Sequence, residues 1–364
     1  MSASLLKIDN LRTYFYSRSK RAFIRSVDGV SLAINRGETL GIVGESGCGK
    51  SVTALSVMGL ITATPGVITG RIDFANGTLH RNLLDGLDQS VRLSEEEGRI
   101  MDVVKDSGAW QRQSDRLQRG VRGGEIAMIF QNPKASMNPF EPVGAQIVEA
   151  VRLHTEHTGK KEAEQRALHW LERVRIDSPR LRFHNHPYGL SGGMCQRAMI
   201  AMALAAEPSL LIADEPTTGL DATIQSKIVD LLAELKAEIG ITTLLISHDM
   251  GVIGRLADRV AVMYGGRVVE EGGAQQVLAG GEGNHPYTRA LIASIPGAAE
   301  VRQKSYLQAI EGDVLDTINI PAGCRFYERC NRVTEAVRER CADCEPQLFD
   351  AGSGQRVRCW LFAP

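Results

Sequence analysis

The chain lacks several features that mark particular classes of protein. Only 5% of its 364 residues are aromatic, and the net charge at pH 7 is −1. A balanced charge gives no electrostatic argument for binding nucleic acid. No stretch reaches the roughly 18–20 apolar residues that a membrane span needs, and residues 1–9 lack the apolar core of a signal peptide. The sequence therefore predicts a soluble, cytoplasmic protein whose membrane attachment, if any, comes through partners.

Cysteine is scarce in the main body of the chain, where only Cys48 and Cys195 occur, whereas five cysteines lie between residues 324 and 359. In a reducing compartment such clustering favours a metal site over disulfides. No internal repeat and no low-complexity tract is present. The chain is long enough for two domains. From residue 296 the composition shifts to Pro, Gly, Cys and charge, which predicts a domain boundary near 296–305.

Short apolar runs alternate with helical patterns along most of the chain. Strands are expected at 5–8, 30–34, 39–43, 68–74, 126–130, 210–213 and 242–246, with a hairpin at 260–270. Helices are expected at 148–153, 162–174, 196–206, 224–239 and 275–295. This alternation favours a parallel sheet covered on both faces. Residues 76–123 are polar and Gly-rich, which indicates a surface insertion with one helix near 93–105.

Residues 44–51, Gly-Glu-Ser-Gly-Cys-Gly-Lys-Ser, fit the phosphate-loop template G-x-x-x-x-G-K-[ST] at every fixed position. The motif lies between an expected strand and an expected helix. Its glycines let successive N–H groups point at an anion, and the helix N-terminus adds the positive end of its dipole. Lys50 is expected to reach the β- and γ-phosphates, and Ser51 to bind Mg²⁺. An accidental match of a glycine-rich turn is the alternative. The expected phosphate contacts are Gly44, Ser46, Gly47, Cys48, Gly49, Lys50, Ser51 and Val52.

The expected strand at 210–213 ends on Asp214 and Glu215. Ligands of open α/β sheets bind at the carboxyl ends of the strands. Asp214 suits a contact to Mg²⁺ through water, and Glu215 is placed to polarise an attacking water. Taken alone, the pair is better explained as the start of a solvated loop.

Residues 190–197, Leu-Ser-Gly-Gly-Met-Cys-Gln-Arg, lie between these two motifs and resemble the signature motif of the ATP-binding-cassette (ABC) ATPases. Ser191 and the N–H groups of Gly192 and Gly193 can bind phosphate oxygens at a helix N-terminus. The resemblance implies an α/β fold, a P-loop NTPase core with an antiparallel β subdomain, in a nucleotide-binding domain at 1–295. It also implies an inserted helical subdomain at about 132–204 and a small Cys-rich C-terminal domain at 296–364.

Further residues are similar to conserved positions of that family. Gln131 resembles the glutamine that senses Mg²⁺, Asp221 lies in a segment that resembles the D-loop, and His248 resembles the switch histidine. The implied catalytic residues are Glu215, His248 and Gln131, and the implied Mg²⁺ ligands are Ser51, Gln131 and Asp214. A lone histidine after a strand is usually polar surface, but here it is in register with the other motifs.

The aromatic run at residues 14–16 offers a surface on which adenine could stack. The family pattern favours Phe15 for this role, with Tyr14 or Tyr16 as alternatives. An ordinary alternating strand explains these side chains equally well.

Family members form head-to-tail dimers, so Ser191 and Gly193 would act on the partner's ATP. Segments 41–47, 128–139, 199–204 and 285–291 are similar to the ATPases of oligopeptide and dipeptide importers. That branch implies a second, non-identical ATPase subunit, two permeases, an extracytoplasmic substrate-binding protein, and a peripheral position on the cytoplasmic face of the cell membrane. A soluble cassette ATPase of translation or repair and a non-catalytic subunit are the alternatives. The chain departs from the family in its long 76–123 region and at Cys195 and Gly219.

Related importer ATPases carry a C-terminal cysteine motif that can hold an iron–sulfur cluster. Four thiolates suit a [4Fe–4S] cluster or a structural Zn²⁺. The resemblance favours Cys324, Cys330, Cys341 and Cys359, with Cys344 as the alternative to Cys341. A short segment of this composition has little core of its own and needs such a staple. Free thiols are the alternative.

Overall fold

The structure is a computed structural model that describes residues 4–61, 66–96, 99–155, 158–294 and 310–364. The chain divides into two compact units, each described by itself. Unit 1 comprises Met1–Leu5, Asn35–Thr39 and Gln118–Ile246, and unit 2 comprises Leu6–Ile34, Leu40–Leu117 and Ser247–Pro364. Within the described ranges, every helix is too short or too polar to cross a bilayer.

Unit 1 contains three parallel strands in the order β10–β9–β8. Their bounds are β8 Ile126–Ile129, β9 Leu210–Asp214 and β10 Thr242–Ile246. Every residue of β8 and β9 is buried, as expected for parallel strands covered on both faces. The register pairs Ile129 with Ala213 and Ile246 with Asp214, so the polar residues that follow these strands gather at one edge.

The rest of unit 1 is mainly helical, and α4, α5, α6 and α7 pack against one another. Trp170 and Leu171 of α5 are buried in this packing. The last helix ends at Gly240 in the left-handed conformation, with φ 62°, which is the usual glycine stop signal. The helices predicted at 148–153, 162–174, 196–206 and 224–239 are therefore confirmed. The bounds are α3 Pro133–Ser136, α4 Val143–His154, α5 Lys160–Arg173, α6 Pro179–Phe183, α7 Gly192–Leu204 and α8 Ala222–Ile239.

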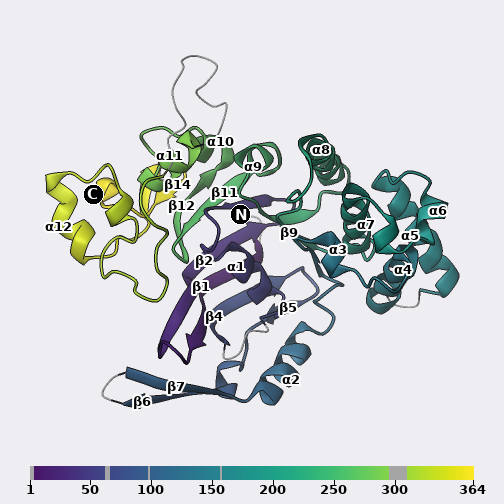
Figure 1. The fold of residues 1–364 in the computed structure, drawn as a ribbon, viewed down its shortest axis with the longest axis horizontal. Coiled ribbons are helices and arrows are strands. Elements are labelled where there is room, and N and C mark those ends of the chain that lie inside the picture. The colour runs from purple at the N-terminus through teal and green to yellow at the C-terminus, as the bar shows by residue number, and fades with distance from the viewer. Residues whose placement is uncertain (1–3, 62–65, 97–98, 156–157, 295–309) are drawn as a thin grey trace. The chain divides into compact units, whose positions relative to one another are not determined.

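Unit 2 contains an antiparallel sheet in the order β2–β1–β4–β5 and a mixed set of strands in the order β13–β14–β12–β11–β3 (Figure 1). β11 runs parallel to β3 and antiparallel to β12, which confirms the hairpin predicted at 260–270. The bounds of the strands are β1 Ser4–Ser17, β2 Ala22–Asn35, β3 Thr39–Val43, β4 Gly66–Ala75, β5 His80–Asn82, β11 Arg259–Tyr264, β12 Arg267–Gly273, β13 Phe349–Gly352 and β14 Gln355–Val357. The helices of its main body are α1 Lys50–Val57, α9 Met250–Leu256, α10 Ala274–Leu278 and α11 Pro286–Ala293.

The helix predicted near 93–105 is wrong. That stretch forms the antiparallel hairpin of β6, Val91–Glu96, and β7, Arg99–Lys105, and the helix α2 follows it at Ser107–Gln118. The alternation of Val91 and Leu93, and the β-branched pair at 103–104, favour strands.

The helix predicted at 275–295 is two helices, α10 and α11, because the glycines at 280, 281 and 283 interrupt it. Gly280 has φ 65°, which an L side chain rarely adopts. His285 then caps α11 by accepting a hydrogen bond from the Tyr287 N–H at 3.0 Å. The predicted domain boundary at 296–305 lies outside the described residues.

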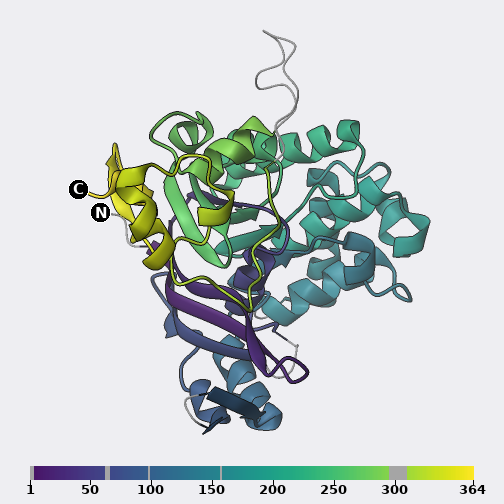
Figure 2. The same cartoon turned by 60° about the vertical axis from the view of Figure 1, so that its left-hand side comes forward.

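The C-terminal segment, residues 310–364, contains α12 at Glu335–Asp343 besides β13 and β14, and it is drawn in yellow-green to yellow in Figure 2. β14 pairs with β12, so this segment extends the mixed sheet of unit 2.

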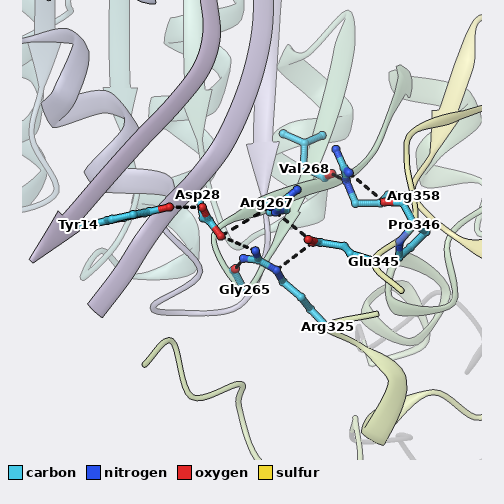
Figure 3. Close-up of polar contacts among 9 residues, drawn as sticks. All are labelled: Tyr14, Asp28, Gly265, Arg267, Val268, Arg325, Glu345, Pro346 and Arg358. Carbon is cyan, nitrogen blue, oxygen red and sulfur yellow. Dashed lines mark hydrogen bonds and ion pairs between the residues drawn. The ribbon is translucent and has the colours of Figure 1, made fainter. Parts of the chain in front are cut away.

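Buried ion pairs attach the C-terminal segment to β2 and to the β11–β12 turn (Figure 3). The guanidinium of Arg325, 5% exposed, pairs with Asp28 of β2 and donates to the Gly265 carbonyl. Its Nε lies 3.0 Å from Glu345, which Arg267 also reaches at 3.0 Å. Burial alone would raise the pKa of Asp28, but hydrogen bonds from Tyr14 and Arg325 outweigh it and lower the pKa. The network is therefore charged and internally compensated.

Candidate nucleotide-binding site

The loop of residues 44–51 connects β3 to α1 in unit 2, as the sequence predicts. Its backbone needs glycine at three positions, because Gly44, Gly47 and Gly49 have φ values of 155°, 81° and 104°. A Cβ at Gly49 would lie 2.2 Å from the Ser26 carbonyl oxygen, and one at Gly44 would lie 2.2 Å from that of Met263. Packing therefore fixes both ends of the loop, while a Cβ at Gly47 would meet no atom within 4 Å. The open middle leaves room for an anion at the N-terminus of α1.

Lys50 is 5% exposed, and its ammonium group folds back over the loop. It donates to the carbonyl oxygens of Gly44 at 2.8 Å and Glu45 at 2.9 Å. A phosphate oxygen could replace these carbonyl contacts, which makes Lys50 a ready cation at the mouth of the loop. Cys48 is buried, and burial raises the pKa of its thiol. That environment fits a packing residue.

Glu45 has an unusual number of polar contacts for a loop residue. Its N–H donates to the Tyr287 hydroxyl at 2.8 Å. Its carboxylate accepts two hydrogen bonds from Arg329, at 2.8 and 3.0 Å, although Arg329 is 284 positions away along the chain. No local pattern in the sequence indicates Tyr287 or Arg329 as a partner of Glu45, because both lie far from it along the chain.

His248 lies in the same unit as the loop. The Ser247 N–H donates to the Ile42 carbonyl of β3 at 3.2 Å, which places His248 just beyond the strand that leads into the loop. Asp249 caps α9 by accepting hydrogen bonds from the N–H groups of Gly251 and Val252. The His248 side chain is exposed.

Unit 1 brings Gln131 and Glu215 together. Gln131 follows β8 and donates from Nε2 to a Glu215 carboxylate oxygen at 2.9 Å, while the Thr218 hydroxyl donates to the same oxygen at 2.8 Å. Glu215 has φ 48°, a conformation that costs free energy in a residue other than glycine. Its N–H donates to the Ile246 carbonyl at 2.8 Å, so the strand edge holds this strained backbone in place. Asp214, one residue earlier, is 5% exposed.

The signature segment forms the start of α7. Ser191 caps this helix, its hydroxyl accepting a hydrogen bond from the Met194 N–H at 3.3 Å, and the residue is exposed. A Cβ at Gly193 would lie 2.7 Å from Ile224 of α8, so the glycine permits two helix N-termini to approach. Asp221 caps the second of them by accepting from the Ile224 N–H at 3.0 Å. The N-termini of α7 and α8 therefore lie close together in unit 1.

The aromatic residues of β1 divide between its two faces. Tyr14 and Tyr16 both contact the Phe23 ring, with centroids 5.7 and 5.3 Å apart, and the Tyr14 hydroxyl donates to Asp28. Phe15 is half-buried and points to the opposite face, because side chains alternate along a strand. Of the three, Phe15 is the side chain that these contacts leave for another role.

Four cysteines line one small cavity, namely Cys324, Cys330, Cys341 and Cys359. Cys344 is exposed and lies outside that lining. Burial raises the pKa of Cys324 to about 12 and that of Cys359 to about 11, which favours the neutral thiols. In the ranges that the structure describes, no group of three or more His, Cys, Asp or Glu side chains is arranged as a metal-binding set.

Comparison with known proteins agrees with these features. The family model described as "ABC transporter" matches residues 27–218, and the one described as "Oligopeptide/dipeptide transporter, C-terminal region" matches residues 269–336. A probable peptide ABC transporter ATP-binding protein, y4tR of Sinorhizobium fredii, is 42% identical over 98% of this chain and 94% of its own. The oligopeptide transport ATP-binding protein AppD of Bacillus subtilis is 40% identical over 99% of this chain and 97% of its own.

A solved structure supports the same fold. The dimeric structure of MJ0796, a bacterial ABC transporter cassette, is similar with a TM-score of 0.57 and 27% identity. The similarity covers 74% of this chain and 98% of that cassette.

Proposed function

Because the chain belongs to the ABC transporter family and carries its ATP-hydrolysing domain, we propose that it powers the uptake of peptides or related small solutes through an importer. The full-length similarity to peptide and oligopeptide transport ATP-binding proteins, at 40–42% identity, is the observation that carries this proposal. The match to the C-terminal region of oligopeptide and dipeptide transporters supports it as well. A soluble cassette ATPase is not favoured, since these relatives match from one end to the other.

We assign the phosphate contacts to the loop of residues 44–52 and adenine stacking to Phe15. Lys50 would exchange its carbonyl partners for β- and γ-phosphate oxygens, as its position 2.8 Å from the Gly44 oxygen supports. Glu215 would polarise the attacking water, with Gln131 and Thr218 fixing its carboxylate. His248 would contact the γ-phosphate.

Oxygen donors of the kind that Mg²⁺ prefers are present at Ser51, Gln131 and Asp214. Asp214 fits this role because its carboxylate is 5% exposed at the carboxyl end of a parallel strand. When bound, Mg²⁺ neutralises charge on the phosphate oxygens.

We propose that the chain acts as a head-to-tail dimer with a second, non-identical ATPase subunit. Ser191, Gly192, Gly193 and Asp221 would then meet the partner's nucleotide. The exposure of Ser191 at a helix N-terminus supports this role. Two permeases, an extracytoplasmic binding protein and a position on the cytoplasmic face of the membrane complete the proposed importer.

The proposed domains are a nucleotide-binding domain at 1–295, with a helical subdomain at about 132–204, and a Cys-rich domain at 296–364. We further propose that Cys324, Cys330, Cys341 and Cys359 hold a [4Fe–4S] cluster or Zn²⁺. Their common cavity and soft sulfur donors support this assignment, and the exposed Cys344 is the weaker candidate.

The catalytic assignment is tested with Glu215→Gln in the full-length chain, co-purified from membranes with its permeases. The amide keeps the shape of the side chain but is no base, so hydrolysis at this site is expected to fall about 100-fold. Nucleotide binding should be retained. Glu164→Gln is the matched control, because the Glu164 side chain is 43% exposed and its ion pair with Lys160, at 4.0 Å, lies at the surface. Undiminished turnover of Glu215→Gln would overturn the assignment.

The metal assignment is tested by iron, sulfide and zinc analysis of anaerobically prepared protein. Cys341→Ser is expected to lose the metal, and Cys344→Ser, the control, to retain it. Wild-type protein without iron or zinc, or equal loss in both variants, would contradict the proposal.

A further inference from the structure

Glu45 places a negative charge in the loop that the proposed function assigns to phosphates. An unpaired carboxylate there would repel a polyphosphate, because like charges at short range oppose binding. The structure compensates this charge with Arg329, whose guanidinium holds both carboxylate oxygens at 2.8 and 3.0 Å. Bidentate pairing of this kind fixes geometry as well as charge.

The ion pair is largely shielded from water. The Arg329 side chain is 6% exposed, and that of Glu45 is 22% exposed. The guanidinium of an arginine is charged at every working pH. Its Nη1 also lies 3.3 Å from the Tyr264 hydroxyl, and its Nε donates to the Glu311 carbonyl at 3.0 Å. These contacts hold the Arg329 guanidinium in position in addition to its contact with Glu45.

The surroundings of Arg329 are rigid and aromatic. Tyr264, Tyr287 and Phe326 form one cluster, with ring centroids 4.7 to 5.5 Å apart. Tyr287 is fully buried and accepts the Glu45 N–H. The aromatic cluster therefore contacts the backbone of the loop through Tyr287. It also supports Arg329, which binds the Glu45 carboxylate.

Arg329 belongs to the segment that carries the thiols. It is the last residue of the short helix η3, Tyr327–Arg329. One hydrogen bond links this helix back to Cys324, and another links it forward to Cys330. The Tyr327 N–H donates to the Cys324 carbonyl at 3.0 Å, and the Cys330 N–H donates to the Tyr327 carbonyl at 3.1 Å. A change in the position of either cysteine would therefore move the turn from which Arg329 reaches the loop.

We propose that Arg329 is a positioning residue of the phosphate loop, which neutralises and orients Glu45 and so makes nucleotide affinity depend on the state of the cysteine-bearing turn. This inference deepens the proposed function, because it requires that the loop bind nucleotide. It assigns to the C-terminal segment a direct influence on the nucleotide site of its own chain.

The test measures binding of MgADP to the full-length chain by calorimetric titration. Arg329→Gln is expected to weaken binding roughly tenfold, since it leaves an unpaired carboxylate beside the phosphates. Adding Glu45→Gln is expected to restore most of the affinity, because the uncompensated charge is then gone. Arg332→Gln is the matched control: Arg332 lies in the same segment but is 45% exposed and 3.6 Å from Glu282. In ATP turnover, Arg329→Gln should raise KM while leaving kcat nearly unchanged.

A purely structural role for Arg329 predicts a different pattern. It would lower thermal stability without changing MgADP affinity, or would weaken binding equally with and without Glu45→Gln, and either result overturns the proposal. If Arg329→Gln does not fold, Arg329→Lys keeps the charge but loses the fork, and a smaller loss that Glu45→Gln removes is expected.

The link to the thiols is tested with Cys330→Ser in two backgrounds. It is expected to weaken MgADP binding in the otherwise wild-type chain and to have little effect in Glu45→Gln/Arg329→Gln. Equal effects in both backgrounds, or none in either, would refute the link. Lys50→Ala tests nucleotide binding by the loop itself, and unchanged MgADP binding in that variant would contradict the proposed function. If Lys50→Ala weakens binding but the Arg329 variants do not, only the proposed role of Arg329 is wrong.

Discussion

The C-terminal segment and the insertion after β4 are both joined to the sheets of unit 2, but in different ways. Buried charges join the C-terminal segment to residues almost three hundred positions away, such as Asp28 and Glu45. The insertion is joined through the edge strand β5, which pairs with β4 a few residues before it, and through a hydrogen bond from Lys105 to the first residue of β4. A segment's influence on a distant site thus depends on which groups it places there, and sequence proximity is no guide to it.

The other contacts of the insertion involve β4 and its own elements. The Lys105 ammonium donates to the Gly66 carbonyl at 2.9 Å and lies 3.7 Å from the centroid of the Trp110 ring. The two ends of the β6–β7 hairpin meet where the Asp106 N–H donates to the Ser90 carbonyl at 2.9 Å. We therefore expect changes in this hairpin to alter stability with little effect on nucleotide binding.

The largest effect should follow from breaking the network of Figure 3 at its centre. Arg325→Met leaves the buried Asp28 carboxylate without its closest cation. Removing one partner of a buried pair is strongly unfavourable, so the free energy of unfolding should fall by about 3 kcal/mol in denaturant titrations. Adding Asp28→Asn should recover part of the loss, and Arg332→Met should change little. A loss below about 0.5 kcal/mol, as for a surface pair, would show that buried charges do not hold the C-terminal segment in place.

A second link between the C-terminal segment and the sheet lies at Glu270, which is fully buried on β12. Its carboxylate accepts hydrogen bonds from the side chains of Asn284 and Gln355 and from the His285 N–H. Glu270→Gln would turn an amide NH₂ toward these donors, and we expect about 2 kcal/mol lower stability. Glu282→Gln, at a side chain that is 91% exposed, serves as the control. Equal stability of the two variants would show that Glu270 does not join the segment to the sheet.

Shortening the insertion tests whether it contributes to stability alone or also to nucleotide binding. Replacing residues 92–104 by Asn-Gly joins the paired residues Val91 and Lys105 through a two-residue turn. Stability should fall by about 1.5 kcal/mol, because the buried Val103 side chain is lost. Affinity for MgADP should change less than about twofold. A tenfold change would place the insertion beside the C-terminal segment as a determinant of the site.

The smallest effect concerns pH. Burial lowers the pKa of Lys105 to about 8, from a usual value of 10.5. Between these values the unfolded chain binds more protons than the folded chain, so stability should rise as the pH increases from about 8 to 10.5. We expect a gain of about 1 kcal/mol, since the group is only half-buried. Lys105→Met should flatten this part of the curve, and an unchanged slope would exclude Lys105 as its source.

Local chemistry made much of the fold and part of the site predictable. Glycines with positive φ, a following helix and a preceding apolar strand identify the loop of residues 44–51 without any distant contact. The strand that precedes Gln131 and the one that ends at Asp214 are likewise visible as short apolar runs, and their parallel register brings Gln131 to Glu215. The family resemblance added the roles of these residues, which remain predictions.

Other features could not be predicted because they arise only in three dimensions. Nothing near Glu45 indicates Arg329, and nothing near Asp28 indicates Arg325, since each pair spans more than 280 positions. Cysteine spacing alone left Cys341 and Cys344 as alternatives, and burial within a shared cavity separates them. The β6–β7 hairpin replaces the helix predicted near 93–105, because strand formation there depends on the cross-strand partners that the hairpin brings together.

The span between Glu45 and Arg329 also affects the timing of maturation. A ribosome adds roughly 5–20 residues per second, so the 284 positions between these partners take about 15–60 s to translate. During that interval the nascent chain already contains the whole glycine-rich loop but not the arginine that neutralises its carboxylate. Tight nucleotide binding should therefore emerge late in synthesis, after the C-terminal turn has left the exit tunnel.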